Sequence, residues 1–277
     1  MRDLPFKAQL ILIAACLPFT CSAGTAKKTK WILDWSDEFN GAAGARPDPA
    51  KWVYDLGSTG WGNQELEDYT DKPENVSIDG RGHLAIRAIR SDSGTYTSGR
   101  LKTKGRFAVQ YGRIEARIRI PDGGRGIWPA FWMLGDDISE VGWPRSGEID
   151  LMENRGDEPS IIHGTVHGPG YSGDKGISAQ IGLGGGARFS RRFHVFGVEW
   201  SPGLIEFFLD GVPRAKVSPA ILPAGTKWVF DKPFFLLLNL AVGGDWPGKP
   251  DSTTGFPQTM LVDWVRVWRA AGRSDVP

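Results

Sequence analysis

The segment from Gly147 to Asn154 places three acids, Glu148, Asp150 and Glu153, among apolar residues. On a β-strand, successive side chains point to opposite faces, so Glu148 and Asp150 share one face. Strict alternation would turn Glu153 to the other face. One extra residue, a β-bulge near Leu151-Met152, would return it, and bulges commonly re-aim side chains next to active sites. We therefore expect a bulged strand that carries three carboxyl groups on one face.

Two of these carboxyl groups could cleave a glycosidic bond. Four pleated steps of roughly 3.3 Å separate the two Glu backbones by about 13 Å. If the side chains reach inward, the carboxyl groups could approach about 5 Å, the spacing of retaining glycosidases. In that chemistry Glu148 attacks the anomeric carbon, while Glu153 first protonates the leaving oxygen and then activates water. Asp150 could hydrogen-bond Glu148 and hold its charge state, and repulsion among the three acids should raise at least one pKa.

Two other interpretations of this segment stay open. The acids could lie on a solvent-facing strand whose outer face happens to be acidic. They could also bind Ca²⁺, although the segment lacks the glycine-turned loop of oxygen ligands that such sites use.

The rest of the chain after Trp31 is dominated by strand and turn patterns. Two segments alternate apolar and polar residues with a period of two, which predicts half-buried strands. A third is almost continuously apolar, as expected for a strand buried on both faces, and a fourth closes the chain as another strand. Two Asp-Gly pairs between strands predict hairpin turns. The half-buried strands are Leu84–Ile89 and Arg113–Ile120, and the strand buried on both faces is Phe234–Val242. The closing strand is Leu261–Trp268, and the hairpin turns are Asp79-Gly80 and Asp210-Gly211.

The absence of long helical periodicity in the sequence favours an all-β fold. Many strands with frequent turns over about 240 residues predict one antiparallel sandwich rather than two domains. We expect this domain to span residues 31–270, between a disordered junction at 24–30 and a C-terminal tail at 271–277.

The first 23 residues have the pattern of a secretory signal peptide. Ala8–Leu17 is mostly apolar and Cys21-Ser22-Ala23 offers a small-residue cleavage site. The apolar run is too short for a comfortable membrane span, so we expect a secreted or periplasmic protein. Ile13–Cys16 weakly resembles a lipoprotein cleavage site, which leaves lipid anchoring as the alternative. Both cysteines lie in this segment, so no disulfide is expected in the mature chain.

The amino-acid composition indicates which kinds of ligand the protein could bind. The net charge of +1 provides no global field for nucleic acid or an anionic membrane. The 12 tryptophans suggest a surface that stacks on flat apolar ligand faces, although core packing could use many of them. We expect a monomer.

The segment from Ser146 to Glu153 resembles the signature of glycoside hydrolase family 16, in its laminarinase-like branch. Other segments resemble blocks of the same family in the expected order, and together they cover roughly Trp31 to Trp268. These segments are Trp61–Leu66, Ser98–Leu101, Tyr111–Arg117, Gly126–Leu134, Thr165–Gly168 and Asn239–Gly244.

The resemblance implies a concanavalin-like β-jelly roll of two antiparallel sheets, with a substrate cleft on the concave face. It also implies retaining endo-hydrolysis without a catalytic cofactor. Members with the longer acid spacing seen here are typically β-1,3-glucanases, and mixed-linkage β-1,3-1,4-glucan is a further expected substrate.

By this resemblance, Trp128 and Trp132 line the cleft around the scissile sugar, whose C–H face packs well on an aromatic ring. Core packing is the alternative for both rings, and Trp143 fits either role.

Polar substrate contacts also follow from the resemblance. His167 could hydrogen-bond Glu153 or the substrate near the leaving group, or it could be a structural histidine. Asn63 and Arg100 match the family's glycone-side contacts, against a turn-forming Asn and a solvated Arg.

Many family members bind a structural Ca²⁺ on the convex side. The matching positions are Glu38, Gly82 and Asp263, where Gly82 would act through its carbonyl oxygen.

Three other functions compete with this prediction. A non-catalytic glucan-recognition protein could use the same fold, but such relatives usually lack the glutamates. A licheninase, agarase or carrageenase would share the mechanism, and sulfated polymers would call for a more basic chain. A transglycosylase would differ only in the acceptor that reaches the covalent intermediate.

Overall fold

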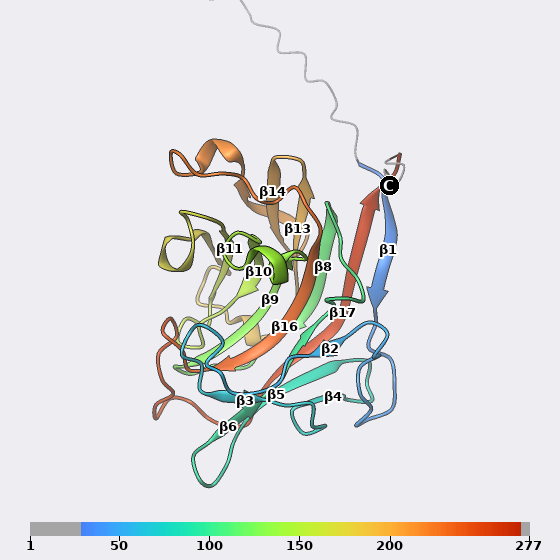
Figure 1. Ribbon diagram of the computed structural model, residues 1–277. Coiled ribbons are helices and arrows are strands. Elements are labelled where there is room, and N and C mark those ends of the chain that lie inside the picture. Colours follow the sequence, from blue (N-terminus) through green and yellow to red (C-terminus); the bar gives the residue numbers. More distant parts are fainter. Residues whose placement is uncertain (1–28, 273–277) are drawn as a thin grey trace, which may run out of the picture.

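The predicted strands assemble into two stacked sheets in a computed structural model, which describes residues 29–272 (Figure 1). The predicted all-β sandwich is confirmed, and every pair of adjacent strands is antiparallel except β3 with β6. The predicted signal peptide, 1–23, lies outside the described residues, as do most of the predicted junction, 24–30, and tail, 271–277.

The larger sheet has ten strands in the order β15-β14-β13-β8-β17-β5-β6-β3, with β1 beside β17 and β4 beside β5. Its strands are β1 (Trp31–Asp37), β3 (Glu67–Tyr69), β4 (Val76–Ile78), β5 (Leu84–Arg90), β6 (Tyr96–Ser98), β8 (Gly112–Arg119), β13 (His194–Ser201), β14 (Leu204–Leu209), β15 (Val212–Val217) and β17 (Gln258–Ala270).

The smaller sheet has seven strands in the order β12-β11-β10-β9-β16-β7-β2. Its strands are β2 (Val53–Tyr54), β7 (Arg100–Lys102), β9 (Ile127–Gly135), β10 (Glu148–Glu153), β11 (Ile161–His167), β12 (Ile177–Gly182) and β16 (Phe234–Val242). Helical turns are short: α1 (Ile138–Val141), η1 (Gly173–Lys175), η2 (Phe189–Arg191) and η3 (Pro219–Ile221).

The main core lies between the sheets because each contributes alternate apolar side chains to it. On β8, Ile114, Ala116 and Ile118 are fully buried, as the period of two predicts. On β10, Ile149 and Leu151 belong to the same core. The opposite, outer face of the smaller sheet is therefore the face that can carry polar groups from β10.

Strand β16 is buried at all nine positions, which confirms the prediction from its continuous apolar run. One set of its side chains, including Leu236 and Leu238, enters the main core. Phe235 and Leu237 instead form a small second cluster with Leu134, against which Ile138 of α1 packs. The helical turn thus helps to cover one end of the outer face.

Both predicted hairpin turns form. Asp210 and Gly211 join β14 to β15 with φ values of 52° and 75°, the pair of positive angles that a tight hairpin needs. Asp79 and Gly80 join β4 to β5, where the Asp79 N–H donates to the carbonyl of His83 at 2.9 Å.

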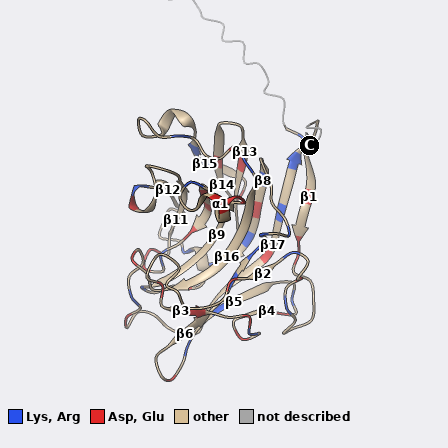
Figure 2. Ribbon diagram, viewed as in Figure 1, with Lys and Arg blue, Asp and Glu red and all other residues tan. Residues whose placement is uncertain are grey.

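Charged residues of both signs are spread over the sheets, including β8 and its neighbour β17 (Figure 2). On β8, Arg113, Glu115 and Arg117 occupy the positions between the core residues, and Arg113 pairs with Glu115. No helix among residues 29–272 is long and apolar enough to cross a membrane.

Candidate active site

Strand β10 contains the β-bulge that the acid spacing predicts. On the β9 side, Asp150 lies opposite Trp132 and Met152 lies opposite Phe131, so β10 has one extra residue there. The register against β11 shifts over the same stretch, between Asp150 and Glu153. Leu151 and Met152 are both buried. The bulge brings Glu153 back to the outer face of the smaller sheet, beside the other two acids.

Burial and mutual repulsion raise the pKa of all three carboxyl groups. Burial, followed by the charge of Asp150, raises the pKa of Glu148 to about 8. Burial, followed by the charge of Glu148, raises the pKa of Glu153 to about 7. Asp150, only 2% exposed, has a pKa raised well above its usual value, first by burial and then by Glu153. The three groups therefore share protons near neutral pH instead of carrying three negative charges.

Two tryptophans donate hydrogen bonds to the two glutamates. Trp128 Nε1 donates to Glu153 Oε1 at 3.0 Å, and Trp143 Nε1 donates to Glu148 Oε2 at 2.6 Å. Trp128 is half-buried and Trp143 is 48% exposed, so neither ring is a core residue. Each N–H favours the ionised form of its carboxyl group.

His167 lies in the acid cluster, but its contact is Asp150 and not Glu153. Its Nε2 is 3.1 Å from Asp150 Oδ2, because the side chains of β10 and β11 point outward together. Ligand atoms of Glu148, Asp150 and His167 all lie within 4.8 Å of one another. The charge of His167 nevertheless lowers the pKa of Glu153, as do the hydrogen bonds of Trp128 and Thr165.

Arg100 forms the centre of an aromatic sandwich on the other side of β9. Its guanidinium carbon lies 4.7 Å from the ring centre of Trp61 and 4.8 Å from that of Trp132. Asp55 accepts a hydrogen bond from Arg100 Nε at 3.0 Å. The guanidinium is thus fixed and mostly buried, unlike the solvated arginine considered as the alternative.

Asn63 is exposed and lies in the turn before β3. Its Nδ2 donates to Glu65 Oε1 at 3.0 Å, so the side chain is held by a neighbouring acid. The backbone carbonyl of Asn63 also accepts a hydrogen bond from Asp245 N at 2.8 Å, which joins this turn to the segment after β16.

The residues that match the calcium site follow β1, precede β5 and belong to β17 of the larger sheet. Glu38 accepts two hydrogen bonds from Arg266, at 2.9 and 2.8 Å, and this pair lowers the Glu38 pKa. Asp263 pairs with Arg117, while Gly82 lies in the turn before β5. Two carboxylates and a carbonyl are suitable calcium donors, but a cation would have to replace arginine partners.

Several site residues were missed by the sequence analysis. Trp246 packs edge-on against Trp128 and His163, at ring distances of 5.3 and 4.9 Å. Glu65 and Glu67 lie under the Asn63 turn, both buried. Two sequence patterns could have indicated these residues. Glu65 and Glu67 alternate with other residues just after Asn63, and Trp246 closely follows the Gly-Gly pair after β16.

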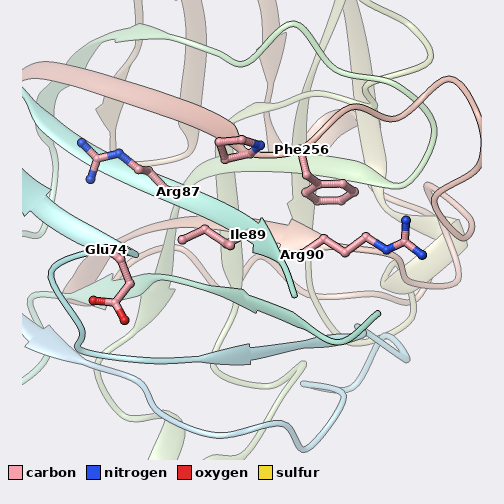
Figure 3. A pocket seen from close by; sticks show the side chains of 6 residues that line it. Glu74, Arg87, Ile89, Arg90 and Phe256 are labelled. Carbon is pink, nitrogen blue, oxygen red and sulfur yellow. The ribbon is translucent and has the colours of Figure 1, made fainter. Parts of the chain in front are cut away.

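A hollow of about 400 Å³ lies elsewhere, on β5 and the turn before β17. Figure 3 shows Glu74, Arg87 and Arg90 at this hollow, with their charged ends pointing in different directions. None of its lining residues contacts the acid cluster, and the charges do not converge on a ligand. The carboxyl geometry, and not the hollow, locates the candidate site.

Comparison with known proteins identifies the family of the chain. The sequence profile of glycosyl hydrolases family 16 matches residues 63–266. A β-glucanase of Rhodothermus marinus is 42% identical over 257 residues, which cover 88% of this chain and 87% of that protein.

Solved structures give the same result. An endo-β-1,3-glucanase from Pyrococcus furiosus is 48% identical, with a TM-score of 0.82 over 88% of this chain and 96% of the other. The laminarinase catalytic domain of Thermotoga maritima is 45% identical, with a TM-score of 0.81 over 87% of this chain and 99% of that domain.

The bulged acidic strand, set among tryptophans on a two-sheet sandwich, defines a glycoside hydrolase. The chain belongs to glycosyl hydrolases family 16, as the resemblance in its sequence predicts. Catalysis in this family needs no cofactor.

Proposed function

We propose that this protein is a retaining endo-glycosidase that hydrolyses β-1,3-linked glucans, with Glu148 as nucleophile and Glu153 as acid/base. The observation that carries the proposal is the bulge of β10, which sets both glutamates on one face with a tryptophan N–H on each. The β-1,3-glucanase and laminarinase activities named for the relatives support the choice of substrate.

The reaction proceeds in two displacements. In the first, a Glu148 oxygen bonds to the anomeric carbon, the glycosidic C–O bond breaks, and Glu153 gives its proton to the leaving oxygen. In the second, Glu153 takes a proton from water, the water oxygen bonds to the same carbon, and the ester to Glu148 breaks. Two inversions retain the β configuration.

The pKa values fit the role of Glu153 directly, whereas Glu148, with a pKa of about 8, must lose its proton when the substrate binds. A pKa of about 7 keeps part of Glu153 protonated near neutral pH, as a general acid requires. Glu148 must be ionised to attack, and the Trp143 N–H and His167 both act against the burial that raises its pKa. The positive charge that develops on the anomeric carbon provides the counter-charge that Glu148 lacks in the free protein.

Asp150 completes the cluster beside the nucleophile. Its pKa is raised well above the ordinary value by burial and then by Glu153, while its hydrogen bond with Glu148 lowers it. In the proposed mechanism Asp150 and Glu148 share a proton, so that the two carboxyl groups do not carry two adjacent negative charges.

The experiment is a substrate panel of laminarin, mixed-linkage β-glucan, agarose and carrageenan, with new reducing ends measured for the wild type and Glu148→Gln. We expect short oligosaccharides from laminarin, and loss of at least about 10³-fold in rate in the variant. NMR of the first product should show the β anomer. Thermal melting and laminarin binding of Glu148→Gln check that the variant is folded.

Other outcomes have distinct meanings. Binding of laminarin without cleavage by the wild type would favour a glucan-recognition protein. Cleavage of another polymer alone would keep the mechanism and replace the substrate. Longer products formed at high oligosaccharide concentration would indicate transglycosylation.

A structural calcium ion is a further part of the proposal. Glu38, Gly82 and Asp263 supply the donor types that Ca²⁺ prefers, from β1's end, the turn before β5 and β17. Bound there, the ion would link these three segments, and Glu38 would exchange Arg266 for the metal.

Secretion and a monomeric state complete the proposal. The apolar segment and small residues before residue 24 support export, which N-terminal sequencing of the mature protein would test. Light scattering of the purified chain would test the monomer.

A further inference from the structure

Four hydrogen bonds form a continuous chain from Trp132 to Asn63. Trp132 Nε1 donates to Asn239 Oδ1 at 2.8 Å, and Asn239 Nδ2 donates to the Tyr69 hydroxyl at 3.1 Å. The Tyr69 hydroxyl donates to Glu65 Oε2 at 2.9 Å, and Asn63 Nδ2 donates to Glu65 Oε1 at 3.0 Å. The chain joins β9, β16 and β3 to the turn before β3.

The donor and acceptor of each hydrogen bond in this series follow from the groups at its two ends, an indole N–H and a carboxylate. An indole N–H can only donate, so the carbonyl oxygen of Asn239 faces Trp132 and its NH₂ faces Tyr69. The Tyr69 oxygen accepts from Asn239, so its proton points to Glu65. Both ends of the chain therefore converge on one carboxylate, which accepts on its two oxygens.

Burial makes these contacts obligatory. Glu65 is 8% exposed, Tyr69 1% and Asn239 6%, so a lost partner would leave a buried polar group unsatisfied. Below them Glu67 is fully buried, and its Oε2 accepts from the N–H of Val242 at 2.6 Å.

Glu67 lies close enough to Glu65 for the two carboxyl groups to influence each other. Burial, followed by the charge of Glu65, raises the pKa of Glu67 to about 9, so Glu67 keeps its proton and adds no second negative charge beside Glu65. The Leu66 N–H donates to the carbonyl of Val242 at 2.8 Å, which ties the same segment to β16. Glu65 is thus held from the backbone as well as from its side chain.

We propose that Glu65 is a positioning residue that sets the orientation of two sugar-contacting groups, Asn63 and Trp132, on the glycone side of the acid cluster. This inference rests on the proposed function. Because Asn63 Nδ2 is used by Glu65, the amide presents Oδ1 to accept from a sugar hydroxyl. Because the Trp132 N–H is used by Asn239, the ring offers only its apolar surface to the sugar.

The test is Glu65→Gln, measured as kcat and KM on laminarin. The amide has one acceptor oxygen where two donors, from Asn63 and Tyr69, converge, so one of them must turn away. Loss of one such hydrogen bond, about 1–1.5 kcal/mol, corresponds to a rise in KM of about 5- to 10-fold. We expect kcat to stay within about threefold, because the acid cluster is untouched.

A matched control separates positioning from stability. Glu115 is 6% exposed, accepts from Arg113 and lies on the larger sheet, away from the acids. Glu115→Gln should lower the melting temperature and leave KM unchanged. Tyr69→Phe provides a second probe if Glu65→Gln does not fold, since it removes only the hydroxyl between Asn239 and Glu65 and should also raise KM.

Each outcome is decisive. An unchanged KM in folded Glu65→Gln, or an equal rise in Glu115→Gln, overturns the positioning role while the proposed function stands. A fall in kcat alone would also overturn it. If the wild type does not cleave laminarin, the proposed substrate fails, and the same comparison is made with the polymer that it does cleave. No cleavage of any polymer would overturn both.

Discussion

Replacing Trp128 by phenylalanine removes one hydrogen bond from the proposed acid/base and keeps an aromatic ring in place. The indole Nε1 donates to Glu153 Oε1 at 3.0 Å, and this contact lowers the pKa of the carboxyl group against the effect of burial. Phenylalanine cannot donate, so the ionised form of Glu153 loses a partner. The pKa of Glu153 should therefore rise.

The size of the rise follows from the strength of the contact. A hydrogen bond to a charged group contributes about 1.5–3 kcal/mol, and one pKa unit corresponds to about 1.4 kcal/mol, which gives about one to two units. Glu153 keeps Thr165 as a second partner and is only half-buried, so water replaces part of the loss. We expect a shift of about one unit, from about 7 to about 8.

The assay is the pH dependence of kcat/KM on laminarin, which reports ionisations of the free enzyme. The reaction needs Glu153 protonated, so activity falls as pH rises through its pKa, and a higher pKa moves this alkaline limb to higher pH. In the proposed function Trp128 also lines the substrate cleft, so the height of the profile should fall. The position of the limb, and not its height, carries the information.

Trp132→Phe is the matched control. It removes an indole N–H from the same strand, but that group donates to Asn239 at 2.8 Å and not to a catalytic acid. The alkaline limb of the Trp132→Phe profile should lie at the same pH as that of the wild type. A Trp128→Phe limb that does not move, or one that moves equally in Trp132→Phe, would refute the assignment of the limb to Glu153. Because the acids are coupled, the limb is compared as an apparent pKa of the cluster.

Two further predictions concern stability. Gly164→Ala on β11 should lower the melting temperature by about 2–10 °C. A Cβ there lies 2.7 Å from a phenylalanine ring of β14, and overpacking costs about 1–3 kcal/mol. The control Gly255→Ala, whose Cβ meets no atom within 4 Å, should melt like the wild type. For the proposed calcium ion, millimolar Ca²⁺ should raise the melting temperature relative to EDTA in the wild type but not in Glu38→Gln. Equal melting of the wild type in Ca²⁺ and EDTA would mean that Arg266 remains the partner of Glu38.

The strand pattern and the acid strand were predictable because both depend on local alternation. The outward acids and inward Ile149 fix which face of β10 meets the core, and the spacing to Glu153 then requires one extra residue. The same reasoning predicted β16 as a strand buried on both faces. It did not indicate that α1 covers part of one face, because the four-residue turn has no periodic pattern.

Contacts between distant segments could not be derived from spacing. Arg100 meets Trp61 and Trp132 because β7, β9 and the turn before β3 converge in space. His167 contacts Asp150 because it lies opposite Glu148 on the neighbouring strand, and Asp150 is the next residue of β10 on the same face. The sequence indicated the residue types, but the partner of each depends on register across the sheet.

The register of β10 also explains why the site needs no strained backbone to hold its acids. Without the bulge, Glu153 would point into the core and Met152 would point outward. Burying an unpartnered carboxyl group costs on the order of 2–7 kcal/mol even when it is protonated, and exposing Met152 loses about 1.5–3 kcal/mol. The bulge leaves one residue unpaired, which costs about 1 kcal/mol. The low-energy register is therefore the one that brings Glu153 to the face of Glu148, so the burial of Leu151 and Met152 positions the proposed catalytic pair.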